Sequence, residues 1–587
     1  MDKPQPQLVT DPILEINSKQ IFFIVFALLM GIGAHYFQLN PGGTGLKLPI
    51  NNIVWIFFAT LIGLGLWQIT LQTKIFYTWF SIAFLIALLL FFIPLFYPNN
   101  HLIEQSYARL LALSAGFLLF IGLHQFQFTK RQTHSLLLLV VLAGCLEACY
   151  SLLQNYTSPN SIFSYIIKYY GAPFGAVQQV NALASFMATT IILSGYLVQK
   201  VDDKKIQVFL ILSTILSTWV ISLSVSRTGY FGALIAIILF VPWAWSQHKN
   251  RLIIFFVAIA LGITLATFKG QPLKDKGEDF MYRYDHHRVY IYKHCWQMIQ
   301  QKPLMGYGYG SFTKEFILQR AKANAKGEKS PFETHKRCNH PHNELMFWIV
   351  EGGIVAALAI LLLIIAFFSL LRTTEITQAL ALLSLTVPIT LHTQLELPFY
   401  HSTLHWFILI VLVFYISQLT ESIQQKSFQY TFALRSFAVL IPLITTIFMV
   451  TNLYATAQIM QFERPKTGTS DIRLLLNIAN PVVFNEGFEF HLNDYRLQAA
   501  TQLKNREEIQ NVIKRLNKLI QTNPYYNYFL LLTKAYIING QPKQAYATLK
   551  YARYLYPEYK PLQRLEKNLF KKDLKHSKIP ALTPAPQ

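Results

Sequence analysis

Long apolar runs constrain this chain more than any other feature of its sequence. A helix needs about 20 predominantly apolar residues to cross the hydrocarbon core of a membrane. About thirteen segments meet that requirement, and they are centred in 21–38, 53–71, 75–97, 108–126, 135–155, 180–198, 206–224, 229–246, 252–268, 344–371, 376–395, 402–419 and 433–452. Only 14% of the residues are charged, against about 25% in a soluble domain. The sequence therefore predicts an all-α polytopic membrane protein and argues against an ordinary soluble enzyme, a disordered chain or a small disulfide scaffold.

The distribution of Lys and Arg among the short loops predicts the orientation of these helices. With a cytoplasmic N-terminus, the basic residues gather in the inner loops, at Lys19, Lys74, Lys130, Arg131, Lys200, Lys204, Lys205, Lys249, Arg251, Arg372, Lys426 and Arg435. The short outer loops carry little beyond Lys47, Lys168 and Arg227. No small-residue cleavage pattern follows the first span, which favours a retained signal anchor. An odd number of spans then places the C-terminal segment outside.

Two polar regions interrupt the apolar pattern and divide the chain into four parts. Helices one to nine occupy 1–268, a long outer loop 269–343, helices ten to thirteen 344–453, and a C-terminal helical domain 454–587. The outer loop holds fourteen Lys and Arg against seven Asp and Glu. This excess favours an anionic ligand on the outer face, and attraction to anionic lipid headgroups is the alternative. The net charge of +22 therefore does not indicate a nucleic acid as partner.

The C-terminal segment has the periodicity of helices and ends in a Pro-rich stretch. Its matches to a tetratricopeptide unit are Phe529, Leu532, Tyr536, Ala545, Leu549, Ala552 and Pro557, with Gly540 at the turn between the two helices. One such unit cannot bury its own apolar face, and 491–524 matches the pattern only weakly. We predict a small helical domain resembling tetratricopeptide repeats, which would bind proteins through a concave face. A plain helical cap on the membrane domain is the alternative.

Cysteine is sparse, with four residues in the whole chain. Cys145 and Cys149 lie one helical turn apart inside a predicted span and are interpreted as packing residues. Cys295 and Cys338 both fall in the outer loop, which is oxidising if it faces a periplasm. A disulfide between them is a hypothesis.

The densest polar cluster runs from residue 335 to 344, at the mouth of the tenth span. His340 and His342 resemble a zinc pair, but no third ligand follows at a metal-type spacing, and zinc sites need three or four ligands. We therefore expect neither a metal nor another cofactor.

Two arginines stand out beside this cluster. Arg227 lies in a short polar break between two apolar runs, where drawing its charge into the membrane would cost up to about 3 kcal/mol; snorkelling to the interface is the alternative. Arg288 opens a helix-like stretch, after which come the alternating glycines Gly306, Gly308 and Gly310, which permit close backbone approach to a ligand. Arginine forks bind phosphate oxygens, and a histidine accepts a proton near neutral pH. These residues predict a site for a phosphate-bearing ligand on the outer face.

Three motifs of this chain, in this order, resemble the O-antigen ligase/polymerase superfamily of polytopic glycosyltransferases. They are Ser226-Arg227-Thr228-Gly229, the block Arg288…Trp296…Pro303-Leu304…Gly306-Tyr307-Gly308, and His342-Asn343 followed by nine residues and Gly353. The ligase pattern ends in a second glycine, where this chain has Ala356. Within the superfamily, 340–345 is similar to the bacterial O-linked oligosaccharyltransferases that glycosylate pilins and other exported proteins. Segments 175–184 and 392–400 fit the same branch, and the tail would represent its extra C-terminal region.

The resemblance implies roles for individual residues. His342 would be catalytic, the donor diphosphate would bind Arg227, Arg288 and His340, and the supporting residues would be Asn343, Gln178 or Gln179, and Tyr400. The donor would be a glycan linked to undecaprenyl diphosphate, and the acceptor a Ser or Thr hydroxyl of a pilin or another exported protein. His342 would deprotonate that hydroxyl, and the arginines would stabilise the leaving diphosphate, in one inverting, metal-independent displacement.

The resemblance also implies a bacterial inner-membrane location, with the active site and the C-terminal domain in the periplasm and membrane lipids around the spans. Two alternatives share this donor: an O-antigen ligase, whose acceptor is lipid A-core, and an O-antigen polymerase, whose acceptor is another lipid-linked repeat. A lipid or solute transporter is a reading from a different class, and it predicts internal repeats with broken helices, of which the sequence has no obvious sign. A non-enzymatic scaffold would leave the arginine and histidine cluster unexplained.

Overall fold

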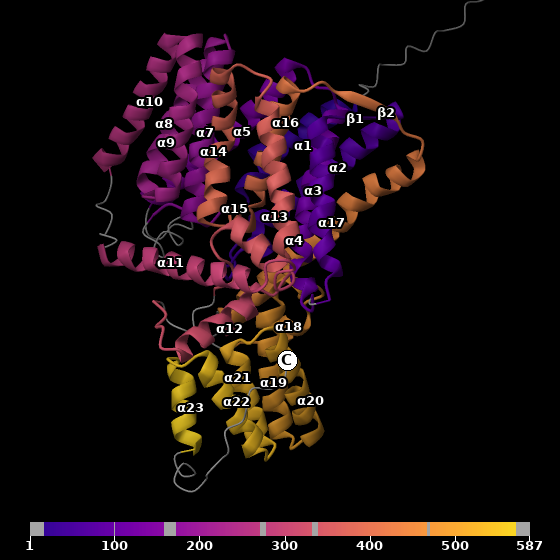
Figure 1. Ribbon diagram of the computed structural model, residues 1–587, viewed down its shortest axis with the longest axis vertical. Coiled ribbons are helices and arrows are strands. Elements are labelled where there is room, and N and C mark those ends of the chain that lie inside the picture. The colour runs from indigo at the N-terminus through magenta and orange to yellow at the C-terminus, as the bar shows by residue number, and fades with distance from the viewer. Residues whose placement is uncertain are drawn as a thin grey trace, which may run out of the picture.

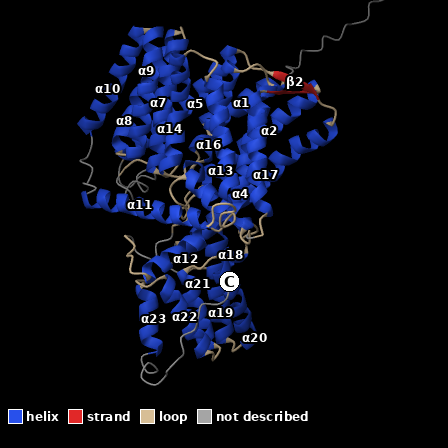
Figure 2. Cartoon of the chain, in the orientation of Figure 1, coloured by secondary structure: helices blue, strands red, loops and turns tan. Residues whose placement is uncertain are grey.

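A computed structural model describes residues 17–98, 100–157, 172–269, 278–331, 338–465 and 470–570. Helices make up nearly all of its secondary structure, and the described residues contain one small two-stranded sheet (Figure 2). The predicted all-α class is confirmed.

Thirteen helical stretches of the described chain are long and apolar enough to cross a membrane, as the sequence predicts. Their helices are α1 (Ser18–Gly31), α2 (Pro49–Gln72), α3 (Trp79–Phe92), α4 (Tyr107–Gln125), α5 (Lys130–Tyr156), α7 (Val180–Lys200), α8 (Lys204–Ser224), α9 (Arg227–Gln247), α10 (Lys249–Lys269), α13 (Glu344–Leu371), α14 (Ile376–Leu395), α16 (Thr403–Thr420) and α17 (Thr431–Glu463). The most apolar window of α7 is 89% buried, whereas that of α17 is only 11% buried. α7 is therefore a central helix of the bundle, and α17 lies at its edge (Figure 1).

The loops gather at two opposite ends of the bundle. At one end β1 (Lys74–Tyr77) pairs antiparallel with β2 (Gln424–Ser427), so the loops after the second and twelfth spans lie together. At the other end lie α11 (Glu278–Gln301), α12 (Phe312–Ala325), the short α15 (Pro398–His401) and the tail (Figure 1). Loops that follow an even number of spans must share one side, so the β1–β2 pairing agrees with the predicted order of crossings.

The long loop is folded rather than extended, and α11 runs across the end of the bundle (Figure 1). An apolar cluster holds it there, built from Ile291, Cys295, Met298, Phe312, Phe316, Cys338, Phe347, Val350 and Leu397. This cluster joins α11, α12, the start of α13 and the segment after α14. The loop and the span ends therefore form one packed unit.

The glycine-rich segment of the loop docks on a break in α13. Gly353 has a φ of 63° inside that helix, and the helical hydrogen-bond ladder is interrupted there. The Tyr307 and Gly308 N–H groups donate to the Val350 and Glu351 carbonyls, both at 2.9 Å. A side chain at Gly306 would collide with the Glu351 carbonyl. Gly306 thus lies close to the backbone of α13, and the approach of these glycines to a ligand stays a prediction.

The tail is a series of antiparallel helices: α18 (Arg473–Leu476), α19 (Asn485–Gln502), α20 (Arg506–Thr522), α21 (Tyr526–Ile538), α22 (Pro542–Leu555) and α23 (Lys560–Phe570). Gly540 has a φ of 74° at the turn between α21 and α22, a conformation that glycine adopts readily. The α21–α22 core also takes in Ile317 and Ala321 from α12. The tail therefore shares its core with the long loop, and its likeness to tetratricopeptide repeats stays a prediction.

Candidate active site

His342 lies in a strained loop between the long loop and α13. Its φ is +55°, a left-handed conformation that is uncommon for residues other than glycine. Its N–H donates to Nδ1 of His340 at 3.3 Å, and its carbonyl accepts from the Tyr292 hydroxyl of α11 at 3.1 Å. The strain therefore persists because contacts on both sides fix the backbone.

Asn343 connects this loop to two helices. Its side-chain oxygen accepts from the Met346 N–H at 2.8 Å and so caps the start of α13. Its amide nitrogen donates to the Gln394 carbonyl, at the end of α14, at 3.1 Å. The residue predicted to support the site thus orients His342 relative to α13 and α14.

Three histidine rings gather at this end of the bundle. The His340 and His342 ring centroids are 4.5 Å apart, and His401 lies 6.5 Å from His340. Burial lowers the pKa of His340 to about 3. Burial also lowers the pKa of His342, where Glu396 opposes the shift and Arg288 adds to it. A histidine with a lowered pKa is neutral at pH 7 and can accept a proton.

Glu396, directly after α14, is the centre of this group. Its carboxylate lies 3.6 Å from Nη2 of Arg288, accepts from Nε2 of Gln179 at 2.8 Å, and lies 3.5 Å from Nε2 of His392. Burial alone would raise the pKa of this carboxyl, but the hydrogen bond from His392 and the nearby imidazoles outweigh burial and hold the pKa well below its usual range. Glu396 is therefore a firmly ionised carboxylate between Arg288 and the histidines.

The two glutamines before α7 have separate partners. Gln179 caps α7 through the Ala182 N–H and donates to Glu396. Gln178, with a φ of 55°, instead accepts a hydrogen bond from Asn40 at 3.1 Å. Gln179 therefore contacts Glu396, and Gln178 contacts the segment between α1 and α2.

Buried groups of α5 hold the loop that carries these glutamines. Glu147 accepts from the Ala176 N–H at 2.6 Å and from His35 at 2.8 Å. Gln154 accepts from the Gly175 N–H at 3.0 Å. Carboxylates inside a membrane bundle are costly and rare, and this one fixes the backbone that leads to Gln179.

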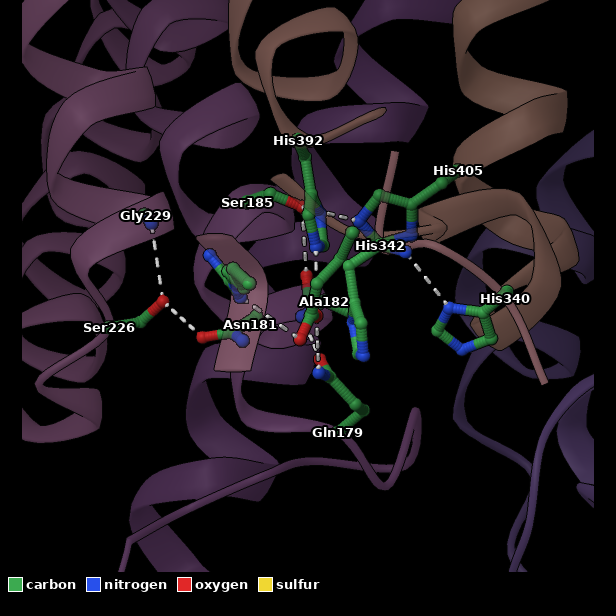
Figure 3. Close-up of polar contacts among 12 residues, drawn as sticks. Gln179, Asn181, Ala182, Ser185, Ser226, Gly229, His340, His342, His392 and His405 are labelled. Atoms are coloured by element: carbon green, nitrogen blue, oxygen red, sulfur yellow. Dashed lines mark hydrogen bonds and ion pairs between the residues drawn. The ribbon is translucent and has the colours of Figure 1, made fainter. Parts of the chain in front are cut away.

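Arg227 opens α9 and is exposed at the edge of the group. The preceding residue, Ser226, accepts from the Gly229 N–H at 3.2 Å and donates to Asn181 at 2.7 Å (Figure 3). This bridge ties the start of α9 to the start of α7, where Gln179 stands. Arg227 is thus placed beside the group, whereas Arg288 is in contact with it.

Tyr400, a predicted supporting residue, belongs to a neighbouring cluster. Its ring packs on Phe347 with centroids 5.7 Å apart, and the Arg109 guanidinium of α4 lies over the same Phe347 ring at 4.4 Å. Arg109 forms an ion pair with Glu351 and stacks on Trp348 at 3.9 Å. Sequence analysis missed Arg109 and Glu351, although a charge inside an apolar run is itself a signal.

Sequence analysis also missed Glu396 as a site residue. The signal was present, because Glu396 is the only acidic residue in 392–400. A buried polar chain continues from it: His392 and His405 both reach the Ser185 hydroxyl, at 2.9 and 2.8 Å (Figure 3).

The predicted disulfide is not formed in the structure. Cys295 and Cys338 are both buried free thiols of one apolar cluster. The Cys338 thiol donates instead to the His340 carbonyl at 3.0 Å, and burial raises its pKa to about 12. Among the described residues, no group of three His, Cys, Asp or Glu could hold a metal ion.

Two family models match this chain. Residues 212–361 match the model described as O-antigen ligase, a range that contains Arg227, Arg288 and His342. Residues 380–569 match the model described as virulence factor membrane-bound polymerase, C-terminal, a range that contains Glu396, Tyr400 and most of the tail. No curated protein matches the chain. The two matches support a place for this chain in the O-antigen ligase/polymerase superfamily, as a membrane enzyme that transfers glycosyl groups.

Proposed function

We propose that this chain is an O-oligosaccharyltransferase, which moves a preassembled glycan from undecaprenyl diphosphate to a Ser or Thr hydroxyl of exported proteins such as pilins. One observation carries the proposal. A cation that suits phosphate, Arg288, contacts the Glu396 carboxylate at the end of the bundle, and the same carboxylate acts electrostatically on a histidine that suits a base, His342. The long loop and the tail gather at that same end (Figure 1).

The proposed reaction is a single displacement. The acceptor oxygen attacks the anomeric carbon, the bond to the diphosphate oxygen breaks, and its electron pair leaves with the diphosphate. Arg288 and Arg227 stabilise the charge that develops there. His342 takes the proton of the hydroxyl, a contribution of about 10²–10⁴-fold in rate. Attack from the face opposite the leaving group inverts the anomeric centre.

The tail favours a protein as acceptor. Its core includes Ile317 and Ala321 of α12, and α12 also packs in the cluster that holds α11 and the start of α13. A protein bound to this helical domain would therefore lie close to His342. A polymerase is the second candidate, because the description of the second matching family model names one.

The acceptor can be identified by mass. The chain is co-expressed with a lipid-linked glycan pathway and a candidate pilin, and the intact mass of the pilin is measured. We expect a shift by one glycan, which His342→Ala abolishes. His101→Ala is the matched control, because His101 is an exposed histidine in an outer-side loop. Glycan on lipid A-core, or longer lipid-linked chains on an unmodified pilin, would instead establish the ligase or the polymerase.

A further inference from the structure

Glu396 places a negative charge in a site that we propose to bind an anion. Such a charge would repel the ligand, so its presence calls for an explanation. Its side chain is 12% exposed and that of Arg288 is 24% exposed, so both are largely withdrawn from water. A diphosphate needs the guanidinium that Glu396 now faces. The carboxylate and the donor therefore compete for one cation.

The contacts of Glu396 are unequal in strength. The bond from Gln179 is short, at 2.8 Å, whereas the contact with Arg288 is 3.6 Å long, beyond the usual range of a charge-assisted hydrogen bond. Arg288 is also the longer and more flexible side chain. When a stronger anion arrives, Arg288 is the partner that can turn away, and the carboxylate stays with Gln179.

A series of buried polar side chains holds the Glu396 carboxylate in place from the membrane side. His392 lies between Glu396 and Ser185, and His405 closes the chain on the same hydroxyl (Figure 3). Each of these side chains is almost completely buried. Glu396 is thus a fixed charge in contact with Arg288. The Tyr292 hydroxyl joins its segment to His342, because it reaches both the His342 carbonyl and that of Gln394, two residues before Glu396.

We propose that Glu396 is the resting counter-ion of Arg288, that the diphosphate of the donor displaces it, and that it then stabilises the cationic form of His342. The proposal rests on the transfer reaction proposed above. The acceptor proton goes to the His342 ring, the electron pair of the broken bond leaves on the diphosphate, and Glu396 remains a carboxylate throughout. Donor binding would thereby draw Arg288 away from the carboxylate, which stays in place and acts on His342.

Glu396→Gln tests both parts, because it keeps the shape of the side chain and removes its charge. The probe for binding is farnesyl diphosphate in detergent micelles, a short polyprenyl diphosphate. We expect the variant to bind it about two- to fivefold more tightly, which is the size of a partly exposed ion pair. In transfer assays we expect both KM for the donor and kcat to fall, the signature of lost ground-state competition combined with lost transition-state stabilisation.

Two further variants test whether tighter binding by Glu396→Gln comes from the lost pair with Arg288. In an Arg288→Ala background, Glu396→Gln should no longer tighten binding, because the competing pair is already gone. Glu328→Gln is the matched control, since Glu328 pairs with Lys293 and His294 of α11, the helix that carries Arg288, at 2.9 and 3.4 Å. It should bind farnesyl diphosphate as the unmodified chain does. If Glu396→Gln is too unstable to purify, Glu396→Asp withdraws the carboxylate by one methylene and should show the same tightening.

The outcomes separate this proposal from the proposed function. Unchanged or weaker binding by Glu396→Gln, or a higher donor KM, overturns the counter-ion role while leaving protein glycosylation intact. Tighter binding together with transfer to a sugar instead of a pilin overturns the acceptor assignment and supports the counter-ion. An unmodified chain that does not bind farnesyl diphosphate overturns both.

Discussion

Two arginine–carboxylate pairs lie at the same end of the bundle and differ in almost every physical respect. Arg109 and Glu351 are in direct contact, with side chains only 7% and 1% exposed. Arg288 and Glu396 are 3.6 Å apart, with side chains 24% and 12% exposed. The first pair is closed to any ligand, and the second is loose and partly open.

The surroundings of the two arginines widen this difference. The Arg109 guanidinium lies over the rings of Trp348 and Phe347, at 3.9 and 4.4 Å, so aromatic rings cover it inside the protein. Glu351 in turn accepts from the Phe312 N–H at 2.9 Å. Burial alone therefore does not identify a functional arginine. The length and the exposure of its ion pair do.

The largest effect is expected from Arg109→Ala. It leaves Glu351 buried and unpaired, which costs about 3–5 kcal/mol of folding stability. Thermal unfolding of the detergent-solubilised protein measures this loss, with Arg372→Ala as the control because Arg372 is exposed after α13. A variant that unfolds like the control but no longer transfers glycan would contradict the structural role of the pair.

Arg288→Lys should reduce transfer and leave folding stability almost unchanged, the opposite of what we expect for Arg109→Ala. A lysine keeps the charge but not the fork that binds two phosphate oxygens, so transfer should fall by at least about tenfold. The unfolding temperature should stay near that of the unmodified chain, because the pair with Glu396 is long and partly exposed. Full transfer by this variant would show that Arg288 acts as a simple charge, and a large loss of stability would erase the contrast with Arg109.

The sequence predicted the membrane-spanning helices of this molecule better than its candidate active site. Spans are visible because their length follows from the thickness of a membrane, and all thirteen are present. His342 and Asn343 were also predicted, from the polar cluster before the tenth span and the family resemblance of the motif that it contains. In both cases the relevant physics is local in sequence.

The residues that were missed depend on contacts between distant segments. Glu396 looks like an ordinary polar residue at the end of a span until Arg288, from another helix, is placed beside it. The close approach of Gly306 to α13 is visible only once the kink at Gly353 is known. Arg109 and Glu351 were missed for the same reason, because the two members of this pair are 242 residues apart along the chain.

The two glutamines offer a finer test of which contacts belong to the site. Gln179→Asn keeps a cap for α7, since Asn is a good cap residue, but draws the amide away from Glu396. A hydrogen bond to a charged group contributes about 1.5–3 kcal/mol, so transfer should fall roughly tenfold. Gln178→Asn shortens the neighbouring side chain, retains a residue that tolerates positive φ, and should change transfer less than about twofold. Equal losses in the two variants would mean that the whole loop, and not the bond to Glu396, sets the rate.

The smallest effect expected is a shift in pH dependence. His342 acts as a base only when neutral, so transfer should be lost as pH falls through its pKa and should persist above it. Burial lowers that pKa, and the acid limb should therefore lie below the usual value of about 6.5. Glu396 opposes the shift, while Arg288, His401 and His340 surround the same ring. Glu396→Gln should accordingly move the limb to still lower pH, by less than about one unit, whereas a rise would show that the loose pair does not act on His342 at all.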